Sequence, residues 1–445
     1  MTVSIETTSN LTANGIIHTL EKTADVRISE LDSPKSPEDT NGFTNGANGH
    51  TLTSIDASLT TITHSTSPRS VPAPDDPAVL QQKTMTDHML TCQWTSTHGW
   101  QTPTIVPYGP LSIMPSSSVL HYATECFEGM KLYRGYDGKL RLFRPTLNAQ
   151  RMLLSSTRIA LPGFDPSELL KLVVKLCAVD GPKWLPKERP GQFLYVRPTM
   201  IGNDPALGVQ QPKEALFFVI LSMFPCMDVL SHPVTGDPRG IRLLASQEDM
   251  VRAWPGGFGY AKVGANYGPS LVAQAEARSR GFDQILWLFG PQCAITEAGA
   301  SNVFVVWRTR EGGLQLVTAP LHGKIILDGV TRRSVLELAR ERLPNGWEQG
   351  GLDPLEVVER EFTMGEVEEA INEGRLLEAF TCGTAFFVAP IECVSWRGKE
   401  LSIPCETVDG VCSGKYTALI KGWLKGIMYG KERHEWGYVV DEADV

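Results

Sequence analysis

Short apolar runs and helical spacings of apolar residues alternate along most of the chain, and together they predict a mixture of strands and helices. Residues 331–343 carry apolar side chains three or four positions apart, which predicts an amphipathic helix. Helices are also expected after Pro145 and Pro166. Short apolar runs predict strands at residues 140–143, 193–196, 216–221, 284–289, 302–307 and 314–317. These elements predict an α+β or mixed α/β fold.

The same patterns predict how the chain is divided. Residues 1–85 are rich in Ser, Thr, Asn and Gly and contain a single aromatic residue, so they lack the apolar surface that would offset the entropy of ordering. We expect a disordered tail there. Residues 225–240 are interrupted by prolines and show no clear periodicity. They are predicted to link a small α/β domain at residues 86–230 to a larger domain at residues 231–445.

Charge and hydropathy exclude two classes of partner. The 445 residues include 41 Lys and Arg against 50 Asp and Glu, a net charge of −9. The chain therefore lacks the basic excess of proteins that bind the phosphate backbone of nucleic acids. Its longest apolar stretch, residues 215–224, is about half as long as a membrane-spanning helix. We expect neither a nucleic acid nor a membrane as partner.

The cysteines and the N-terminal residues bear on compartment. Nine cysteines are scattered without a CxxC pair, which argues against a zinc site and against a disulfide framework, and favours a reducing compartment. Acidic residues outnumber basic ones over residues 1–40, unlike in a mitochondrial transit peptide. The cytoplasm is the expected compartment, with mitochondrial import as the alternative. No metal site is expected.

Two single charged residues lie in unusually uncharged surroundings. Lys262 lies within YAKVGANYG, where burial would depress its pKa and make it a nucleophile for Schiff-base chemistry; the alternative is an ordinary surface lysine. Tyr267, five residues later, has a hydroxyl suited to a phenolate-type oxygen of a cofactor. Glu297 lies within ITEAGASN and is either a loop acid or a buried one that needs a cationic partner, such as a protonated pyridine nitrogen.

Two further segments carry features of phosphate binding. Val330 and Thr331 follow Asp328-Gly329 at the predicted start of a helix, where free backbone N–H groups and a hydroxyl suit a phosphate. A simple helix cap is the alternative. Residues 382–385, with the sequence CGTA, form a second loop with a hydroxyl group.

These segments, in this order, resemble branched-chain amino acid aminotransferases, which are pyridoxal 5'-phosphate enzymes of fold type IV. The resemblance extends over residues 86–430. Its segments are FEGMK at 127–131, LFRP at 142–145, YVRP at 195–198, IGNDPALGV at 201–209, KVGANYG at 262–268, ITEAGASN at 295–302, GVTR at 329–332 and CGTA at 382–385.

The resemblance implies a role for each matching residue toward the cofactor. Lys262 would carry pyridoxal phosphate as a Schiff base and move the proton of the substrate α-carbon. Glu297 would pair with the pyridine nitrogen, and Tyr267 would contact the ring hydroxyl. The phosphate would be held by Arg151, Val330, Thr331 and Thr384.

The resemblance also implies a substrate pocket and an oligomer. The pocket would be lined by Tyr122, Phe127, Tyr195, Arg197 and Ala385. The loop that carries Leu207 and Val209 would reach the site of a neighbouring subunit, which implies a homodimer. The implied reaction is ping-pong transamination of leucine, isoleucine and valine with 2-oxoglutarate, which gives branched 2-oxo acids and glutamate.

Some positions depart from the pattern of that family. Ala300 and Ser301 replace Thr-Met of the usual E-x-G-T-M-N, and Cys382 replaces a small residue before GTA. Because of these changes, an alternative stays open: an aminotransferase of the same fold that acts on a different aliphatic substrate in a specialised pathway. An inactive homologue that serves as a binding subunit is a further alternative, against which the joint presence of Lys262 and Glu297 argues.

Overall fold

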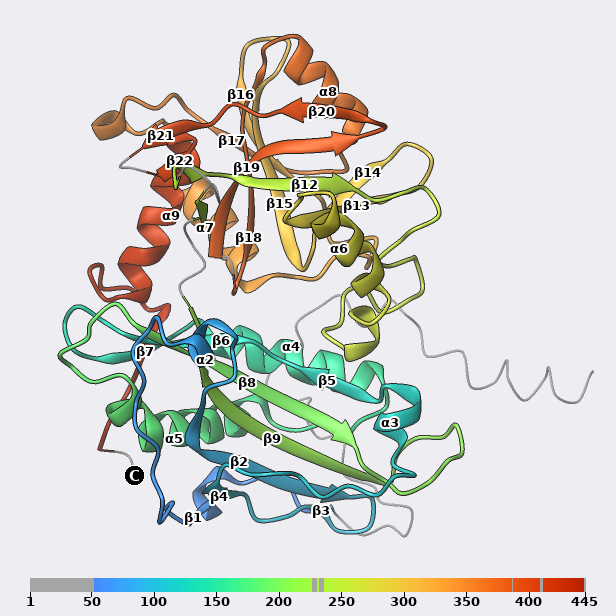
Figure 1. Ribbon diagram of the computed structural model, residues 1–445, viewed down its shortest axis with the longest axis vertical. Coiled ribbons are helices and arrows are strands. Elements are labelled where there is room, and N and C mark those ends of the chain that lie inside the picture. Colours follow the sequence, from blue (N-terminus) through green and yellow to red (C-terminus); the bar gives the residue numbers. More distant parts are fainter. Residues whose placement is uncertain (1–51, 226–229, 232–235, 386, 409–410, 444–445) are drawn as a thin grey trace, which may run out of the picture. The chain divides into compact units, whose positions relative to one another are not determined.

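The computed structural model describes residues 52–225, 230–231, 236–385, 387–408 and 411–443 (Figure 1). Residues 1–51 of the predicted tail and half of the predicted linker at 225–240 (residues 226–229 and 232–235) lie outside the described residues. Residues from Leu52 on belong to one compact unit. Within the described part of the chain, no helix is long and apolar enough to cross a membrane.

Ten strands of the described chain form the first sheet. Its central strands, β8 and β9, pair antiparallel with Val196 opposite Leu221. Helices α4 (Pro145–Arg158) and α5 (Pro166–Trp184) pack together, and the apolar side of α5 joins the core of this sheet. The strand order is β1 (Thr61–Ile62), β4 (Thr104–Pro107), β2 (Met85–Thr95), β9 (Glu214–Met223), β8 (Phe193–Gly202), β6 (Met130–Arg134), β7 (Leu140–Phe143) and β23 (Gly437–Val440), with β3 (Gly99–Trp100) on β2 and β5 (Glu125–Phe127) on β8.

A second sheet, of nine described strands, closes on itself. Its order is β14 (Ala294–Ala298), β13 (Gln284–Phe289), β12 (Ile241–Ala245), β19 (Phe387–Trp396), β18 (Leu376–Gly383), β15 (Ser301–Arg308), β16 (Leu314–Thr318) and β17 (Glu356–Glu359), with β20 (Lys399–Ser402) on β19. Strands β14 and β15 also pair, with Glu297 opposite Asn302. This pairing links the start of the order back to β15, so six of the strands form a ring.

The helices of the second half cover this ring in separate groups. Helices α7 (Val330–Arg342) and α9 (Lys415–Met428) share a core with β18, whereas α6 (Ser270–Ser279) packs on β13 and α8 (Met364–Asn372) on β18 and β20. The strands and helices expected from the sequence are present, and most strands extend beyond their predicted ends. The architecture is mixed α/β, as the sequence predicts.

The boundary of the tail differs from the prediction. Residues 52–85 form defined elements, including β1 and the short helix α2 (Pro77–Leu80). Ile55, Ala57 and Val79 are buried in the core of the first sheet. Composition averaged over 85 residues hides these few apolar anchors, because they gain their burial from a surface that the rest of the chain supplies.

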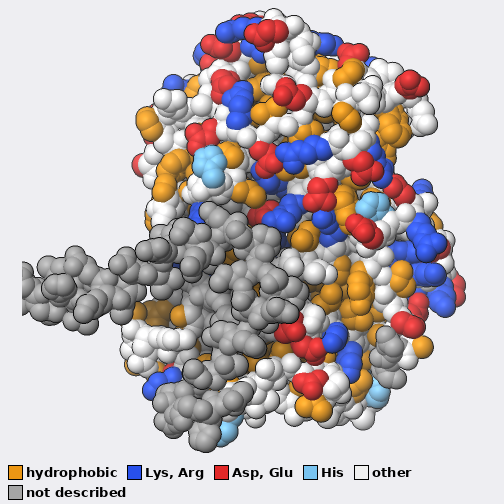
Figure 2. Space-filling view, turned by 180° about the vertical axis from the view of Figure 1, so that it is seen from behind, with side chains coloured by type: hydrophobic (Ala, Val, Ile, Leu, Met, Phe, Trp, Pro, Cys, Tyr) orange, Lys and Arg blue, Asp and Glu red, His pale blue; other side chains and the backbone are white. Residues whose placement is uncertain are grey.

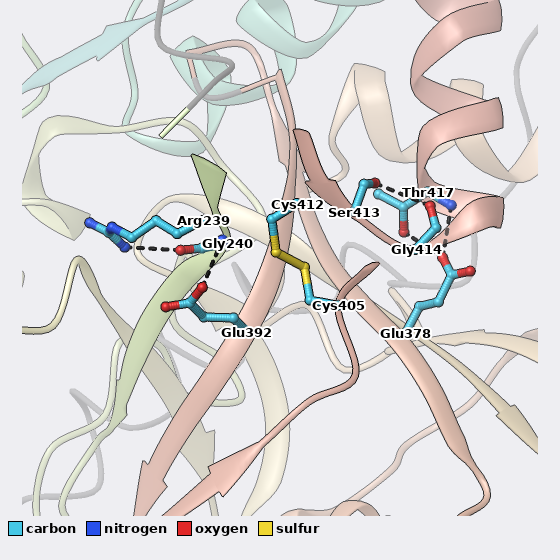
Figure 3. The surroundings of a disulfide bond; sticks show 9 residues. All are labelled: Arg239, Gly240, Glu378, Glu392, Cys405, Cys412, Ser413, Gly414 and Thr417. Atoms are coloured by element: carbon cyan, nitrogen blue, oxygen red, sulfur yellow. Dashed lines mark hydrogen bonds between the residues drawn. A yellow bond between two sulfur atoms is a disulfide. The ribbon is translucent and has the colours of Figure 1, made fainter. Parts of the chain in front are cut away.

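A disulfide joins Cys405 to Cys412 across the hairpin of β21 (Glu406–Val408) and β22 (Val411–Ser413) (Figure 3). The other six cysteines of the described chain are buried free thiols. The sequence argued against disulfides, and Cys405–Cys412 is therefore an exception to that prediction. Its spacing of seven residues is not a sequence signal by itself, because the hairpin is what brings the two side chains together.

Charged side chains of both signs are interspersed over the face of the molecule shown in Figure 2. Many of the surface charges form ion pairs, such as Arg310 with Glu369 and Glu373. This mixture agrees with the near balance of basic and acidic residues in the sequence.

Candidate active site

Lys262 lies between β12 and α6, and residues of the first half of the chain hold its backbone. Its N–H donates to Ser155 Oγ of α4 at 2.8 Å, and its carbonyl accepts from the N–H of Phe127 at 3.1 Å. The side chain is half-buried, and Nζ donates to the hydroxyl of Tyr267 at 3.0 Å. The Phe127 ring centroid lies 5.0 Å from Nζ. The structure thus brings the predicted lysine and tyrosine into contact beside an aromatic ring.

Arg151, on α4, forms a two-pronged ion pair with the fully buried Glu128. Arg151 Nε lies 2.7 Å from Glu128 Oε1, and Nη2 lies 2.8 Å from Oε2. Asn148 donates a further hydrogen bond to Oε2 at 2.8 Å. Burial acts to raise the pKa of Glu128, but the adjacent Arg151 guanidinium outweighs it and holds the pKa below its ordinary value. Glu128 is therefore an anion.

The remaining Arg151 prong points to the start of α7. Nη1 donates to the carbonyl of Asp328 at 2.8 Å, one residue before Gly329, the N-cap of α7. No side chain of the described residues caps this helix, and Val330 and Thr331 are buried there. A guanidinium beside free helix N–H groups makes a site for an anion such as phosphate.

Thr384 completes this corner of the site. Its hydroxyl donates to the carbonyl of Gly129 at 3.2 Å, and it lines one cavity of about 20 Å³ with Val330 and Thr331. The loop at residues 382–385 and the start of α7 therefore meet, as the two predicted phosphate segments require.

Glu297, on β14, is buried at 2% exposure. Oε1 accepts from the N–H of Leu327 at 2.8 Å, and Oε2 lies 2.8 Å from Arg252 Nε in an ion pair. Burial raises the pKa of Glu297 above its ordinary value, while Arg252 opposes that rise. The positive charges of Lys262 and Arg151 also act to lower the pKa of this carboxyl, and we refer to Lys262, Tyr267, Arg151 and Glu297 together as one cluster.

A cavity of about 150 Å³ opens beside this cluster. Its walls include Tyr267, Glu297, Arg252 and Ala300. These residues fit a phosphorylated pyridine. The Arg151 guanidinium suits the phosphate, the buried carboxyl of Glu297 suits the ring nitrogen, and Lys262 and Tyr267 belong to the same cluster.

The structure places the predicted substrate residues in two groups. Phe127, Tyr195 and Arg197 belong to the first: the Arg197 guanidinium lies 4.7 Å from the Phe127 ring centroid, and its Nη2 donates to the Tyr195 hydroxyl at 3.2 Å. The Phe127 ring also contacts Tyr267, with 5.1 Å between centroids, which joins this group to Lys262. Arg197 Nε is buried without a hydrogen-bond partner among the described residues.

The second group lies at the surface of the single chain. Tyr122 is 40% exposed, and its hydroxyl donates to the carbonyl of Leu207. Leu207 and Val209 are 61% and 87% exposed. Ala385 lies apart from both groups: it is half-buried, and its carbonyl accepts from Lys131.

Sequence reasoning missed two charged partners. Glu128 lies within FEGMK, and an acid between an aromatic residue and glycine in an apolar segment is a signal of a buried ion pair. Arg252 does not lie in any recognisable sequence motif. Its Nη2 donates to the carbonyls of Gly259 and Ile325 at 3.1 and 2.9 Å, contacts that only the folded loops create.

Comparison with known proteins identifies the family. The sequence model of amino-transferase class IV matches residues 125–394. The cytosolic branched-chain-amino-acid aminotransferase of Saccharomyces cerevisiae is 46% identical over 397 residues, which cover 88% of this chain and 100% of that protein. The chain belongs to the class IV aminotransferases. The mitochondrial branched-chain-amino-acid aminotransferase of Schizosaccharomyces pombe is 45% identical, over 81% of this chain and 80% of its own length.

Solved structures of branched-chain amino acid aminotransferases share the fold. The branched-chain amino acid aminotransferase of Escherichia coli superposes with a TM-score of 0.59 at 23% identity, covering 76% of this chain and 97% of that one. The T.th. branched-chain amino acid aminotransferase, complexed with N-(5'-phosphopyridoxyl)-L-glutamate, gives 0.57 at 23% identity, covering 79% and 98%. The curated relatives include both cytosolic and mitochondrial proteins.

Proposed function

We propose that this class IV aminotransferase transfers the amino group of leucine, isoleucine or valine to 2-oxoglutarate, with pyridoxal 5'-phosphate as cofactor. The observation that carries the proposal is the contact of Lys262 Nζ with the Tyr267 hydroxyl, in one cluster with buried Glu297 and with Arg151. The branched-chain substrates are inferred from relatives that carry this activity in their names and match most of the chain.

We assign cofactor binding to the residues of that cluster. Arg151, Thr331, Thr384 and the backbone of Val330 would bind the phosphate, and Tyr267 would hold the ring hydroxyl. Glu297 would bind the protonated ring nitrogen. Bound pyridoxal phosphate supplies an electron sink for the bond that breaks at the substrate α-carbon.

The protein side chains then divide the remaining work. Lys262 Nζ anchors the cofactor, and when released it takes the α-proton of the substrate and returns it later. Tyr267 holds this amine at hydrogen-bond distance, and the half-buried setting limits water around it. Arg252 offsets the burial of Glu297, which keeps a negative charge available for the ring nitrogen.

We propose that substrates are selected by an aromatic wall and one cation. Tyr122, Phe127 and Tyr195 would contact aliphatic side chains, and Ala385 would contact the rest of the substrate. A hydrophobic wall distinguishes one methylene by about 1–3 kcal/mol, so several aliphatic side chains would be accepted. Arg197 would bind the second carboxylate of 2-oxoglutarate, consistent with its buried and unpartnered Nε.

We propose a homodimer and a two-domain division. Leu207 and Val209 are large apolar side chains that are exposed in the single chain, and a second copy would bury them. The proposed domains, residues 86–230 and 231–445, would correspond to the two sheets, except that β23 returns to the first sheet. The cytoplasm remains the proposed compartment.

A second candidate is an aminotransferase for an unusual aliphatic amino acid. Ala300 lines the cavity beside Glu297, and Ser301 packs against Gly383, where an added Cβ would lie 2.8 Å from the serine hydroxyl. Of the departures from the family pattern, Ala300 is therefore at the wall of the proposed site, and Ser301 is beside the CGTA segment.

The absorbance spectrum of the purified protein with pyridoxal phosphate tests the proposal. We expect a visible band that L-leucine, added without an oxo acid, converts to the band of pyridoxamine phosphate. Lys262→Ala should lose the visible band and all turnover, because no other amine occupies its place. A band that ignores leucine, isoleucine and valine but responds to another amine would favour the second candidate, and transamination by Lys262→Ala would refute the role of Lys262.

A further inference from the structure

Lys131, on β6, is a buried lysine beside the proposed active site. Only 7% of it is exposed. Its Nζ donates to the carbonyl of Ala385 at 3.2 Å and lies 4.1 Å from the centroid of the Phe193 ring. Burial of an ammonium group is unfavourable unless such partners offset the loss of water. Lys131 therefore links the first sheet to the turn between β18 and β19.

The neighbouring contact acts on the same turn. Gly129 lies two residues before Lys131, and its carbonyl accepts from the Thr384 hydroxyl at 3.2 Å. Gly129 thus makes a hydrogen bond to Thr384, and Lys131 makes one to Ala385. Thr384 and Ala385 have small side chains, so the bonds to Gly129 and Lys131 help to hold this part of the turn.

Lys131 also lies next to the proposed substrate residues. It is the register partner of Tyr195 on β8, and directly opposed residues of antiparallel strands are neighbours on one face of the sheet. Lys131, Thr331 and Thr384 line the same cavity of about 20 Å³, which has room for about one water molecule. The turn is thus held between the phosphate segment and the substrate wall with little space to shift.

We propose that Lys131 is a positioning residue: by holding the Ala385 carbonyl, it fixes the backbone at Ala385, where the carboxylate that amino-acid and oxo-acid substrates share would bind. This inference rests on the proposed function, in which Ala385 contacts substrate, and adds the residue that orders it. Because both substrates carry that carboxylate, loss of Lys131 should affect both half-reactions.

The test is Lys131→Met, assayed at saturating pyridoxal phosphate. Loss of a hydrogen bond from a charged donor should raise KM for L-leucine and for 2-oxoglutarate by about tenfold each, with kcat within about twofold. Lys131→Arg, which restores a charged donor, should recover part of the loss. Lys171→Met, at a lysine whose side chain is 61% exposed, is the matched control and should leave both constants unchanged.

Binding of 4-methylvalerate, a carboxylate with a leucine-like skeleton, separates this inference from the proposed function. Calorimetry should show about tenfold weaker binding to Lys131→Met than to the native protein, and this holds whichever amine the enzyme turns over. Lys131→Gln, shorter by one atom, gives the same test if the methionine variant does not fold. Unchanged KM and 4-methylvalerate affinity, or a loss confined to kcat, would overturn the inference, whereas failure of the native protein to accept leucine would overturn only the branched-chain assignment.

Discussion

At the scale of single residues, the site depends on charges that are buried in pairs. Glu128 is fully buried and takes two of the three prongs of Arg151, so the direction of the third is fixed toward Asp328 and the start of α7. A buried ion pair is costly to break, because the partner left behind remains a buried charge. Glu128 thus sets where the cation of the proposed phosphate site lies.

Replacing Glu128→Gln should weaken phosphate recognition more than ring recognition. The amide cannot accept both guanidinium bonds, and we expect the dissociation constant for pyridoxal phosphate to rise about tenfold or more. Affinity for pyridoxal, which lacks the phosphate, should change little. Both constants can be measured by fluorescence titration of the apoprotein.

Glu341→Gln serves as the control for that substitution, because its side chain is 63% exposed. If Glu128→Gln weakened the binding of pyridoxal and of pyridoxal phosphate equally, Glu128 would act on the site as a whole rather than through Arg151.

At the scale of elements, the start of α9 depends on a side chain from another strand. Gly414 is the N-cap and has no side chain of its own, so Glu378 of β18 takes its place. The carboxylate accepts from the N–H of Tyr416 at 2.9 Å. It also accepts from the N–H of Thr417 at 2.9 Å and from the Thr417 hydroxyl at 2.8 Å (Figure 3). A Cβ at residue 414 would lie 1.9 Å from Glu378 Cδ, so only glycine leaves room for this cap.

The pH dependence of stability should report this buried cap. Burial raises the pKa of Glu378, against the hydrogen bonds of Thr417 and Tyr416 that lower it. The folded state therefore holds the proton more tightly than the unfolded state, and the free energy of unfolding falls as pH rises through the raised pKa. Glu378→Gln has no proton to lose, so its stability relative to the native protein should increase steadily from pH 4 to pH 7.

Urea denaturation at several pH values measures this difference. Glu248→Gln, at a side chain that is 80% exposed, should give a difference that does not change with pH. A relative stability of Glu378→Gln that falls with rising pH would contradict the raised pKa.

The segment before β2, residues 52–84, is also stabilised by contacts with other parts of the chain. Its backbone is held by side chains of the body: Ala57 N–H donates to Glu168, and Ser65 N–H donates to His88 at 2.9 Å. Ile55 is only 4% exposed. Ile55→Ala should reduce the free energy of unfolding by about 2–4 kcal/mol, as expected for a large-to-small change in a core.

Leu59→Ala is its matched control, because Leu59 is in the same segment but 56% exposed. We expect a loss within about 0.5 kcal/mol there. Similar small effects for both substitutions in thermal or urea denaturation would mean that this segment does not contribute to the core.

At the scale of the whole molecule, the proposed site takes its residues from both sheets. Arg151 and Glu128 come from the part around the first sheet, and Glu297 comes from the ring of the second. Lys262 bridges them, because its backbone bonds to Ser155 and Phe127 while its sequence neighbours continue into α6. The site therefore depends on how the two sheets face each other.

The proposed dimer can be tested through the loop that carries Leu207 and Val209. Val209→Asp should shift the protein from dimer to monomer in light scattering coupled to gel filtration, because a charge would be buried at the contact. Activity should fall together with the dimer fraction. Val439→Asp, at a residue that is 46% exposed on β23, should leave the oligomer unchanged, and a fully dimeric Val209→Asp would place the contact elsewhere.

The sequence alone determined which local elements form, and it pointed to the residues that we propose for the chemistry. Lys262, Tyr267, Glu297 and Thr331 stand out because each lies in a short segment whose composition is unusual for its neighbourhood. Strand and helix types follow from periodicity, since side chains on one face of an element recur at fixed spacings.

Only the tertiary structure decided which charges pair and where the sheets close. Arg252 pairs with Glu297, Glu378 caps α9, and β14 returns to β15 to complete the ring. Most of these contacts join residues that are far apart in the chain. The contacts are strengthened by burial, which only the surrounding fold creates. A linear pattern records what each segment can do, whereas the choice of partner depends on the packing of all the segments together.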